Sequence, residues 1–103
     1  MRLSLSEIEV ITTVFKKHFW VNDHLWIFGS RVDNSKRGVA IDLYIETAYN
    51  PEQAAGSNIL FISDLWIALG EQHIDIVLKL IHSDFDLPIY HVAKKEGIQL
   101  ALA

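Results

Sequence analysis

The chain has no cysteine, which excludes disulfide bonds and metal sites built from thiolates. It also lacks an apolar run of membrane-spanning length, because Asp64 and Asp75 interrupt its long hydrophobic stretch. Positive charge is sparse: the net charge is −4, and the basic residues form only pairs such as Lys36 and Arg37. We therefore expect neither a membrane protein nor a protein that binds nucleic acid.

Several site motifs are absent as well. No two histidines have the H-x-x-H or H-x-x-x-H spacing of a metal site. There is no Gly-x-Gly-x-x-Gly or P-loop sequence, which argues against the common dinucleotide and P-loop folds. The first residues include a basic side chain but no sustained apolar run, so we expect no signal peptide and a cytoplasmic location.

What remains is the composition of an ordinary globular domain. Of 103 residues, 50% are hydrophobic and 21% are charged. A chain of this size can bury one core, which predicts a single domain over residues 1–103.

The first half of the chain predicts a helix and two strands. Apolar residues recur every three or four positions over 6–19, and Ser6 and Glu9 have the spacing of a capping box. The run 24–28 is apolar and ends at Gly29, which predicts a buried strand. Residues 30–37 are expected to form a helical turn that passes into a loop. Residues 40–47 have a period of two and predict a strand, with Ile41, Leu43 and Ile45 on one face and Ala40, Asp42, Tyr44 and Glu46 on the other.

The second half predicts a helix, a strand, a helix and a short final strand. Asn50 and Pro51 mark the start of a helix over 51–69, and Gly70 is expected to be its left-handed cap. This helix is apolar on more than one stripe, which is typical of deep burial or of contact with a partner. Residues 73–80 alternate as a strand, 88–96 form a helix that ends at Gly97, and 98–103 form an apolar edge strand. The order indicates an α/β (α+β) fold, a small mixed β-sheet with helices packed on one face.

Two acids stand inside the predicted strands. Asp42 and Asp75 both lie opposite the aliphatic positions of their strands. If the two strands are neighbours, the carboxylates converge and would repel each other unless a cation or a proton is shared. A hard cation such as Mg²⁺ suits such oxygen ligands. The alternative is two scattered acids on a solvated face.

Gly29 and Ser30 form a second candidate site. A glycine turn between a strand and a helical turn directs backbone N–H groups outward, and these groups with a Ser hydroxyl suit a phosphate. Arg31 and Arg37 add positive charge nearby. The alternative is an ordinary turn followed by a solvated loop.

These segments resemble those of a known family. Three stretches carry the resemblance: the run from Trp26 to Asp33, Lys36-Arg37-Gly38, and the run from Ile41 to Glu46. They resemble the minimal nucleotidyltransferases of the polymerase-β-like superfamily, including antitoxin-type members. The likeness continues in residues 69–77 and 88–100. It implies a polymerase-β-like nucleotidyltransferase fold in which Gly29 and Ser30 bind phosphate, and Asp42 and Asp75 are the second and third metal carboxylates.

The resemblance also implies Mg²⁺ as cofactor and ATP or another NTP as substrate. A nucleoside monophosphate, AMP in the first instance, would pass to a protein or a small molecule. The first metal carboxylate of the family stands where this chain has Ala40, and a methyl group cannot bind Mg²⁺. Neither Val39 nor Ile41 can replace it, and Glu46, on the same face, lies four residues beyond Asp42, about 13 Å along the strand.

Two functions follow from the resemblance. The first is an active transferase that works with a helical HEPN-type partner protein as a toxin–antitoxin pair, or through self-association. The second is a catalytically degenerate domain that acts as a binding module. Residues 59–69 and 98–103 are the candidate contact surfaces for a partner.

Overall fold

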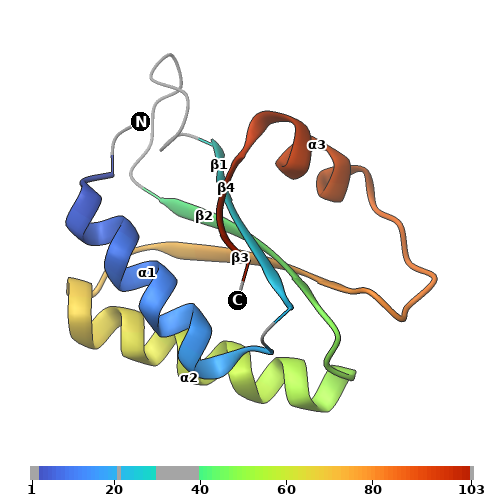
Figure 1. The fold of residues 1–103 in the computed structure, drawn as a ribbon, viewed down its shortest axis with the longest axis horizontal. Coiled ribbons are helices and arrows are strands. Elements are labelled where there is room, and N and C mark those ends of the chain that lie inside the picture. Colours follow the sequence, from blue (N-terminus) through green and yellow to red (C-terminus); the bar gives the residue numbers. More distant parts are fainter. Residues whose placement is uncertain (1–2, 21, 30–39, 103) are drawn as a thin grey trace.

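The computed structural model describes residues 3–20, 22–29 and 40–102. Within them the chain forms three helices and four strands (Figure 1). In chain order the elements are α1 (Leu5–His18), β1 (His24–Phe28), β2 (Ile41–Thr47), α2 (Pro51–Leu69), β3 (Ile74–Leu80), α3 (Pro88–Glu96) and β4 (Ile98–Leu102). The element order predicted from the sequence is confirmed. The helical turn and loop expected over 30–37 lie outside the described residues.

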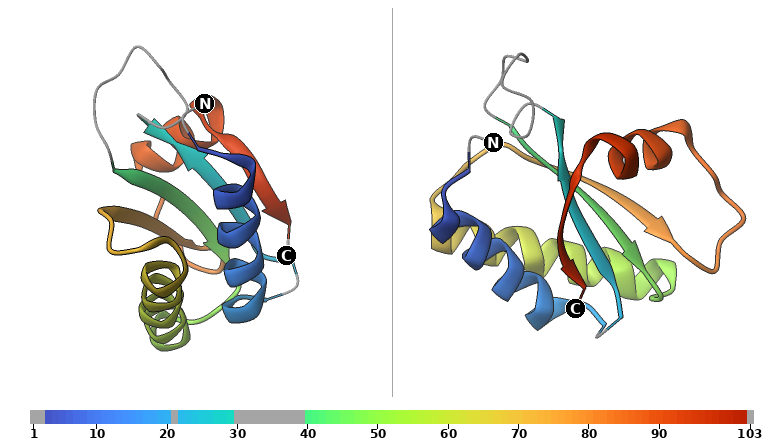
Figure 2. Two further views of the ribbon diagram at one scale, coloured as in Figure 1. Left: turned by 90° about the vertical axis from the view of Figure 1, so that its left-hand side faces the viewer. Right: turned by 45° about the horizontal axis from the view of Figure 1, so that its top comes forward.

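The strands form one mixed sheet in the order β3-β2-β1-β4. β1 pairs antiparallel with both β2 and β4, whereas β2 and β3 are parallel and are connected through α2. The predicted mixed sheet is therefore confirmed, and so is the edge position of the last strand. Figure 2 shows the twist of the sheet and the position of the helices on its two sides.

The helices α1 and α2 lie side by side and cover one face of the sheet (Figures 1 and 2). The aliphatic face of β2 points toward them, and Ile41, Leu43 and Ile45 are fully buried. The helices contribute aromatic side chains: Phe61 of α2 packs edge-on against Phe15 and Phe19, with ring centroids 6.1 and 5.7 Å away. Burial of this apolar surface is the main stabilising contribution on this side of the sheet.

The helix α3 covers the opposite face. Tyr90 and Ala93 of α3 are buried against Trp26 of β1 and Tyr44 of β2. The expectation that the helices pack on one face only is therefore wrong for α3. The physical reason is that Trp26 and Tyr44 make the centre of the second face aromatic, so this face also needs a cover.

Helix α1 begins two residues earlier than predicted. Ser4, and not Ser6, is the N-cap: its side chain accepts a hydrogen bond from Glu7 N, and the Glu7 side chain accepts one from Ser4 N. Both serines precede a Glu by three positions, so spacing alone does not distinguish them. Leu3 decides between them, because it is buried in the same apolar cluster as Ile8 and the pair brackets a cap at Ser4.

Helix α2 begins as predicted and ends differently. Asn50 caps it in a capping box with Gln53, and Pro51 is the first helical residue. Gly70 follows the helix with φ 84° and ψ 166°. The positive φ favours glycine, but this ψ is extended, so the expected left-handed helical cap is not formed. Apolar side chains on more than one stripe are confirmed, since four large ones are exposed: Ile59, Leu60, Trp66 and Ile67.

A buried carboxylate connects the turn before β1 to the end of β2. Asp23 is 2% exposed, and its Oδ2 accepts hydrogen bonds from Thr47 Oγ1 at 2.6 Å and from Trp20 N at 3.1 Å. Its Oδ1 accepts a third, from Ala48 N at 3.0 Å. The carboxylate therefore holds two segments together that are distant in the sequence. No helix within the described residues has the length and apolar character needed to cross a membrane.

Candidate functional site

Gly29 and Asp42 meet where β1 ends and β2 begins. Phe28, the last residue of β1, pairs with Asp42 in the antiparallel register. Gly29 follows with φ 76°, a backbone conformation that side chains disfavour. A Cβ added to Gly29 would collide with Oδ2 of Asp42. The missing side chain therefore lets the carboxylate lie directly beside the glycine backbone.

Asp75 lies beside Asp42 on the neighbouring strand. The parallel register of β2 and β3 pairs Asp42 with Asp75, between the pairs Ile41–Ile74 and Leu43–Ile76. Paired residues of adjacent strands place their side chains on the same face of the sheet, and the strands are about 4.8 Å apart. The two acids are thus neighbours on one face, as the strand patterns required.

A histidine that the sequence did not suggest for this site is His73. Its Nε2 lies 3.0 Å from Oδ1 of Asp75, and the two side chains are 67% and 58% exposed. At such exposure the contact adds little to stability, so its main effect is on the orientation of the Asp75 carboxylate. The i, i+2 spacing of His73 and Asp75 on an extended chain is the signal that points to this contact.

Ala40 precedes β2 and is partly buried. The backbone beside it continues the ladder, since Ile41 N donates to His73 O at 2.9 Å. Ala40 therefore lies immediately before β2 and two residues before Asp42. It supplies a methyl group at the position where the resemblance predicts a metal ligand. Glu46 does not replace this ligand, because its carboxylate contacts other residues.

Glu46 is occupied in another cluster. Its Oε2 accepts a hydrogen bond of 2.7 Å from Tyr44 Oη, and Lys94 Nζ of α3 lies 3.3 Å away. Burial and the Glu46 carboxylate raise the pKa of Tyr44 well above its usual range. Tyr44 therefore stays protonated and donates its hydrogen bond to Glu46. The Glu46 carboxylate thus has its partners away from Ala40, in keeping with the expectation that it does not supply the ligand missing there.

The rest of the predicted phosphate site was Ser30, Arg31 and Arg37, and these residues lie outside the described part of the chain. Among the residues that the structure describes, no three His, Cys, Asp or Glu side chains come together in a group that would hold a metal ion. The site as described therefore consists of the glycine turn at Gly29, the neighbouring carboxylates Asp42 and Asp75, and His73.

Comparison of the chain with protein-family models and with curated proteins found no match. The resemblance to nucleotidyltransferases therefore stays a prediction. The function proposed below rests on the residues of the site.

Proposed function

We propose that this chain is a nucleotide-binding domain of the nucleotidyltransferase type, which binds a nucleoside triphosphate such as ATP together with Mg²⁺. The observation that carries the proposal is the meeting of Gly29, Asp42 and Asp75 at one end of the sheet. A glycine turn beside paired carboxylates combines a backbone suited to phosphate with oxygen ligands suited to a hard cation.

The donor set fits Mg²⁺. Asp42 and Asp75 would hold it, since Mg²⁺ is commonly bound by one or two carboxylates together with phosphate oxygens and water. The bound ion would supply the positive charge that lets two acids and a triphosphate share one site. His73 would fix the orientation of Asp75 through their contact of 3.0 Å. Ser30, Arg31 and Arg37 would complete the phosphate site.

The proposed reaction is transfer of a nucleoside monophosphate to a partner protein or a small molecule, and Ala40 limits its rate. Two-metal transfer stabilises both the entering and the leaving oxygen, and it needs ligands for a second ion. With a methyl group at Ala40, one of those ligands is missing. Each ~1.4 kcal/mol of lost transition-state stabilisation lowers the rate about tenfold.

The binding step is tested by titrating ATP in the presence of Mg²⁺ in a calorimeter. We expect Asp42→Asn and Asp75→Asn each to weaken binding by about tenfold or more, because each removes a charged ligand. Asp84→Asn removes the same charge from an exposed residue of the β3–α3 connection and should leave binding unchanged. Equal affinities for all four proteins would contradict the proposed site.

The transfer step is tested with labelled ATP, Mg²⁺ and candidate acceptors, comparing the unmodified chain with Ala40→Asp. We expect label transfer to rise by about tenfold or more in the variant, because it restores a carboxylate two residues before Asp42. If Ala40→Asp binds ATP but neither protein transfers label, the transferase proposal is wrong and nucleotide binding alone remains.

The second candidate function is a binding module that has lost catalysis. Ala40 favours it, and so do the exposed apolar side chains of α2, of which Ile67 is 82% and Ile59 is 65% exposed. In this proposal those side chains contact a HEPN-type helical protein or a second copy of the chain. The mass of the protein in solution, measured for the unmodified chain and for Ile67→Lys, tests self-association directly.

A further inference from the structure

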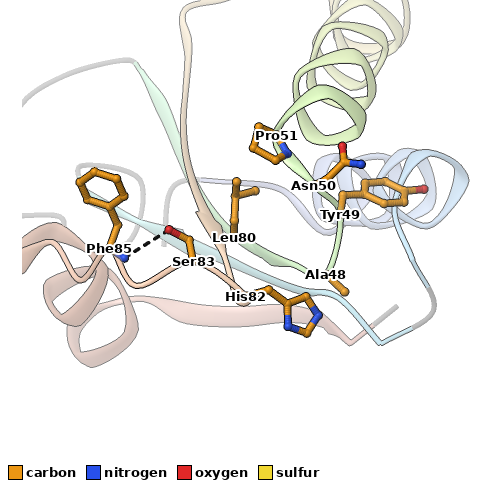
Figure 3. A pocket seen from close by; sticks show the side chains of 8 residues that line it. All are labelled: Ala48, Tyr49, Asn50, Pro51, Leu80, His82, Ser83 and Phe85. Atoms are coloured by element: carbon orange, nitrogen blue, oxygen red, sulfur yellow. Dashed lines mark hydrogen bonds between the residues drawn. The ribbon is translucent and has the colours of Figure 1, made fainter.

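A pocket of about 420 Å³ lies at the opposite end of β2 and β3 from the candidate site. It opens where the two parallel strands end and their connections to α2 and α3 begin (Figure 3). Asp42 and Ala48, which lines the pocket, are six residues apart along an extended chain, or roughly 20 Å. The pocket is therefore separate from the proposed nucleotide site, and its volume is in the range of small-molecule sites.

Hydrogen bonds fix the wall formed by residues 48–51. Ala48 N donates to the buried Asp23 carboxylate, and Tyr49 N donates to Thr47 Oγ1. The capping box of α2 holds Asn50. The Tyr49 ring packs against Phe19 and Trp20, with centroids 6.1 and 5.9 Å away.

The facing wall, formed by residues 80–85, is fixed in the same way. Ile81 N donates to Thr47 O at 3.0 Å, and Ser83 N donates to Leu80 O at 2.9 Å. Phe85 N then donates to Ser83 Oγ at 3.2 Å, as the dashed line in Figure 3 shows. Both walls are thus held by their own hydrogen bonds, so a ligand would not have to order them.

The lining is mostly apolar and carries no formal charge. Ala48, Pro51, Leu80 and Phe85 supply apolar surface, and none of the lining residues is Asp, Glu, Lys or Arg. Phe85 is 72% exposed, so an apolar ligand would remove a large aromatic surface from water. This composition disfavours phosphates, carboxylates and ammonium groups and favours an uncharged ligand.

Three polar side chains line the pocket: Asn50, His82 and Ser83. Ser83 Oγ accepts from Phe85 N, which leaves its hydroxyl hydrogen to donate to a ligand. Within the described part of the chain the His82 ring makes no hydrogen bond to another residue, so a ligand would displace no protein partner from it. Few polar groups on an apolar lining are typical of sites that orient a small molecule.

We infer that this pocket binds a small uncharged aromatic molecule that carries a hydrogen-bonding group such as an amide. The ring lies between Phe85 on one wall and Pro51 on the other. The polar group bonds to Ser83 and His82. This binding is independent of the proposed nucleotide site and requires neither Mg²⁺ nor ATP.

The test is a titration of ¹⁵N-labelled protein with benzamide, followed by amide chemical shifts. We expect saturable shifts at Ala48, Asn50, Ser83 and Phe85, and weaker binding of the charged analogues benzoate and benzamidine. Phe85→Ala should weaken benzamide binding by about tenfold, and so should Ala48→Leu, which fills the pocket. Ile67→Ala removes another strongly exposed apolar side chain, in α2, and should leave binding unchanged.

The same spectra report whether each variant is folded, so lost binding is distinguished from lost structure. Absence of saturable shifts with benzamide would overturn the inference. Shifts spread over the exposed apolar side chains of α2 and α3 would also overturn it. Concentration-dependent shifts of the pocket amides without any probe would assign the pocket to a protein contact and would overturn it too.

Discussion

At the scale of single residues, Asp23 is a buried acid outside the candidate site. Its carboxylate accepts three hydrogen bonds although it is 2% exposed. We expect Asp23→Asn to lower the free energy of unfolding by about 1–3 kcal/mol, because an NH₂ group would face a donor that needs an acceptor. Urea unfolding at neutral pH measures the change.

The control for this substitution is its exposed neighbour in the same turn. Asn22→Ala alters the turn without touching the three hydrogen bonds and should change the free energy of unfolding by less than about 0.5 kcal/mol. Equal losses in the two variants would show that the turn, and not the buried carboxylate, is what stabilises this corner.

Tyr44 makes stability depend on alkaline pH. Burial and the hydrogen bond to Glu46 raise the pKa of Tyr44 above the ordinary tyrosine value of about 10. The unfolded chain therefore loses this proton at a lower pH than the folded chain does. The contribution of the protonated Tyr44 to the free energy of unfolding is fully present below about pH 10 and is lost as the pH rises further.

We expect Tyr44→Phe to remove the part of the decline in the free energy of unfolding above about pH 10 that Tyr44 causes. At neutral pH the variant should lose about 1–2 kcal/mol, because Glu46 then loses the hydrogen bond from Tyr44 Oη. The measurement is the free energy of unfolding between pH 8 and pH 11 for both proteins. An unchanged decline above pH 10 would show that other groups cause it, and Tyr49→Phe is the matched control.

At the scale of elements, a carboxylate contact fastens α1 to α2. Asp64 Oδ2 of α2 lies 2.5 Å from His18 Nε2 and 3.3 Å from Lys17 Nζ, both in the last turn of α1. The hydrogen bond from His18, followed by that from Lys17, lowers the pKa of Asp64. The contribution of the Asp64 carboxylate to the free energy of unfolding is present above the ordinary aspartate pKa of about 4 and is lost as the pH falls through the lowered pKa.

Asp64→Asn should therefore be less stable than the unmodified chain at pH 6, and the difference should shrink as the pH falls toward 3. Urea unfolding at several pH values measures both curves. Asp84→Asn removes an exposed acid elsewhere and should show no such convergence. A constant difference between the Asp64 variant and the unmodified chain across this range would mean that packing, and not charge, fastens the helices.

The elements also show what sequence patterns can predict. Period-two alternation placed Ile41, Leu43 and Ile45 together on one face of β2, because successive side chains of a strand point to opposite faces, and all three are buried. The start of α1 was ambiguous because Ser4 and Ser6 both precede a Glu by three residues. Only the packing of Leu3, a tertiary contact, resolves it.

The candidate site was also only partly predictable from the sequence. The pattern of each strand predicted that Asp42 and Asp75 share a face if the strands are neighbours, but only the register shows that they are paired. The contact of Asp42 with Gly29 depends on where β1 ends relative to β2, which no local pattern specifies. Tyr44 was correctly placed on the face opposite Ile41, Leu43 and Ile45, but the alternation does not show that Trp26 and Tyr90 bury it there, under α3.

At the scale of the whole molecule, one sheet separates two clusters of unequal size. Among the residues that the structure describes, the side of α1 and α2 holds most of the buried aliphatic and aromatic ones, whereas the side of α3 holds four: Trp26, Tyr44, Tyr90 and Ala93. A domain of this size is stable by only about 5–15 kcal/mol. The larger cluster should therefore decide whether the chain folds, and the smaller one should decide how firmly α3 is held.

Phe61 tests this division. It is fully buried between α1 and α2, and it contacts the rings of Phe15 and Phe19. Phe61→Ala should lower the free energy of unfolding by about 3–5 kcal/mol, because the surrounding rings cannot fill the cavity. Leu60→Ala, its 56% exposed neighbour, should change it by less than about 1 kcal/mol. Thermal unfolding of both variants measures the contrast, and similar losses would show that the larger cluster does not carry the fold.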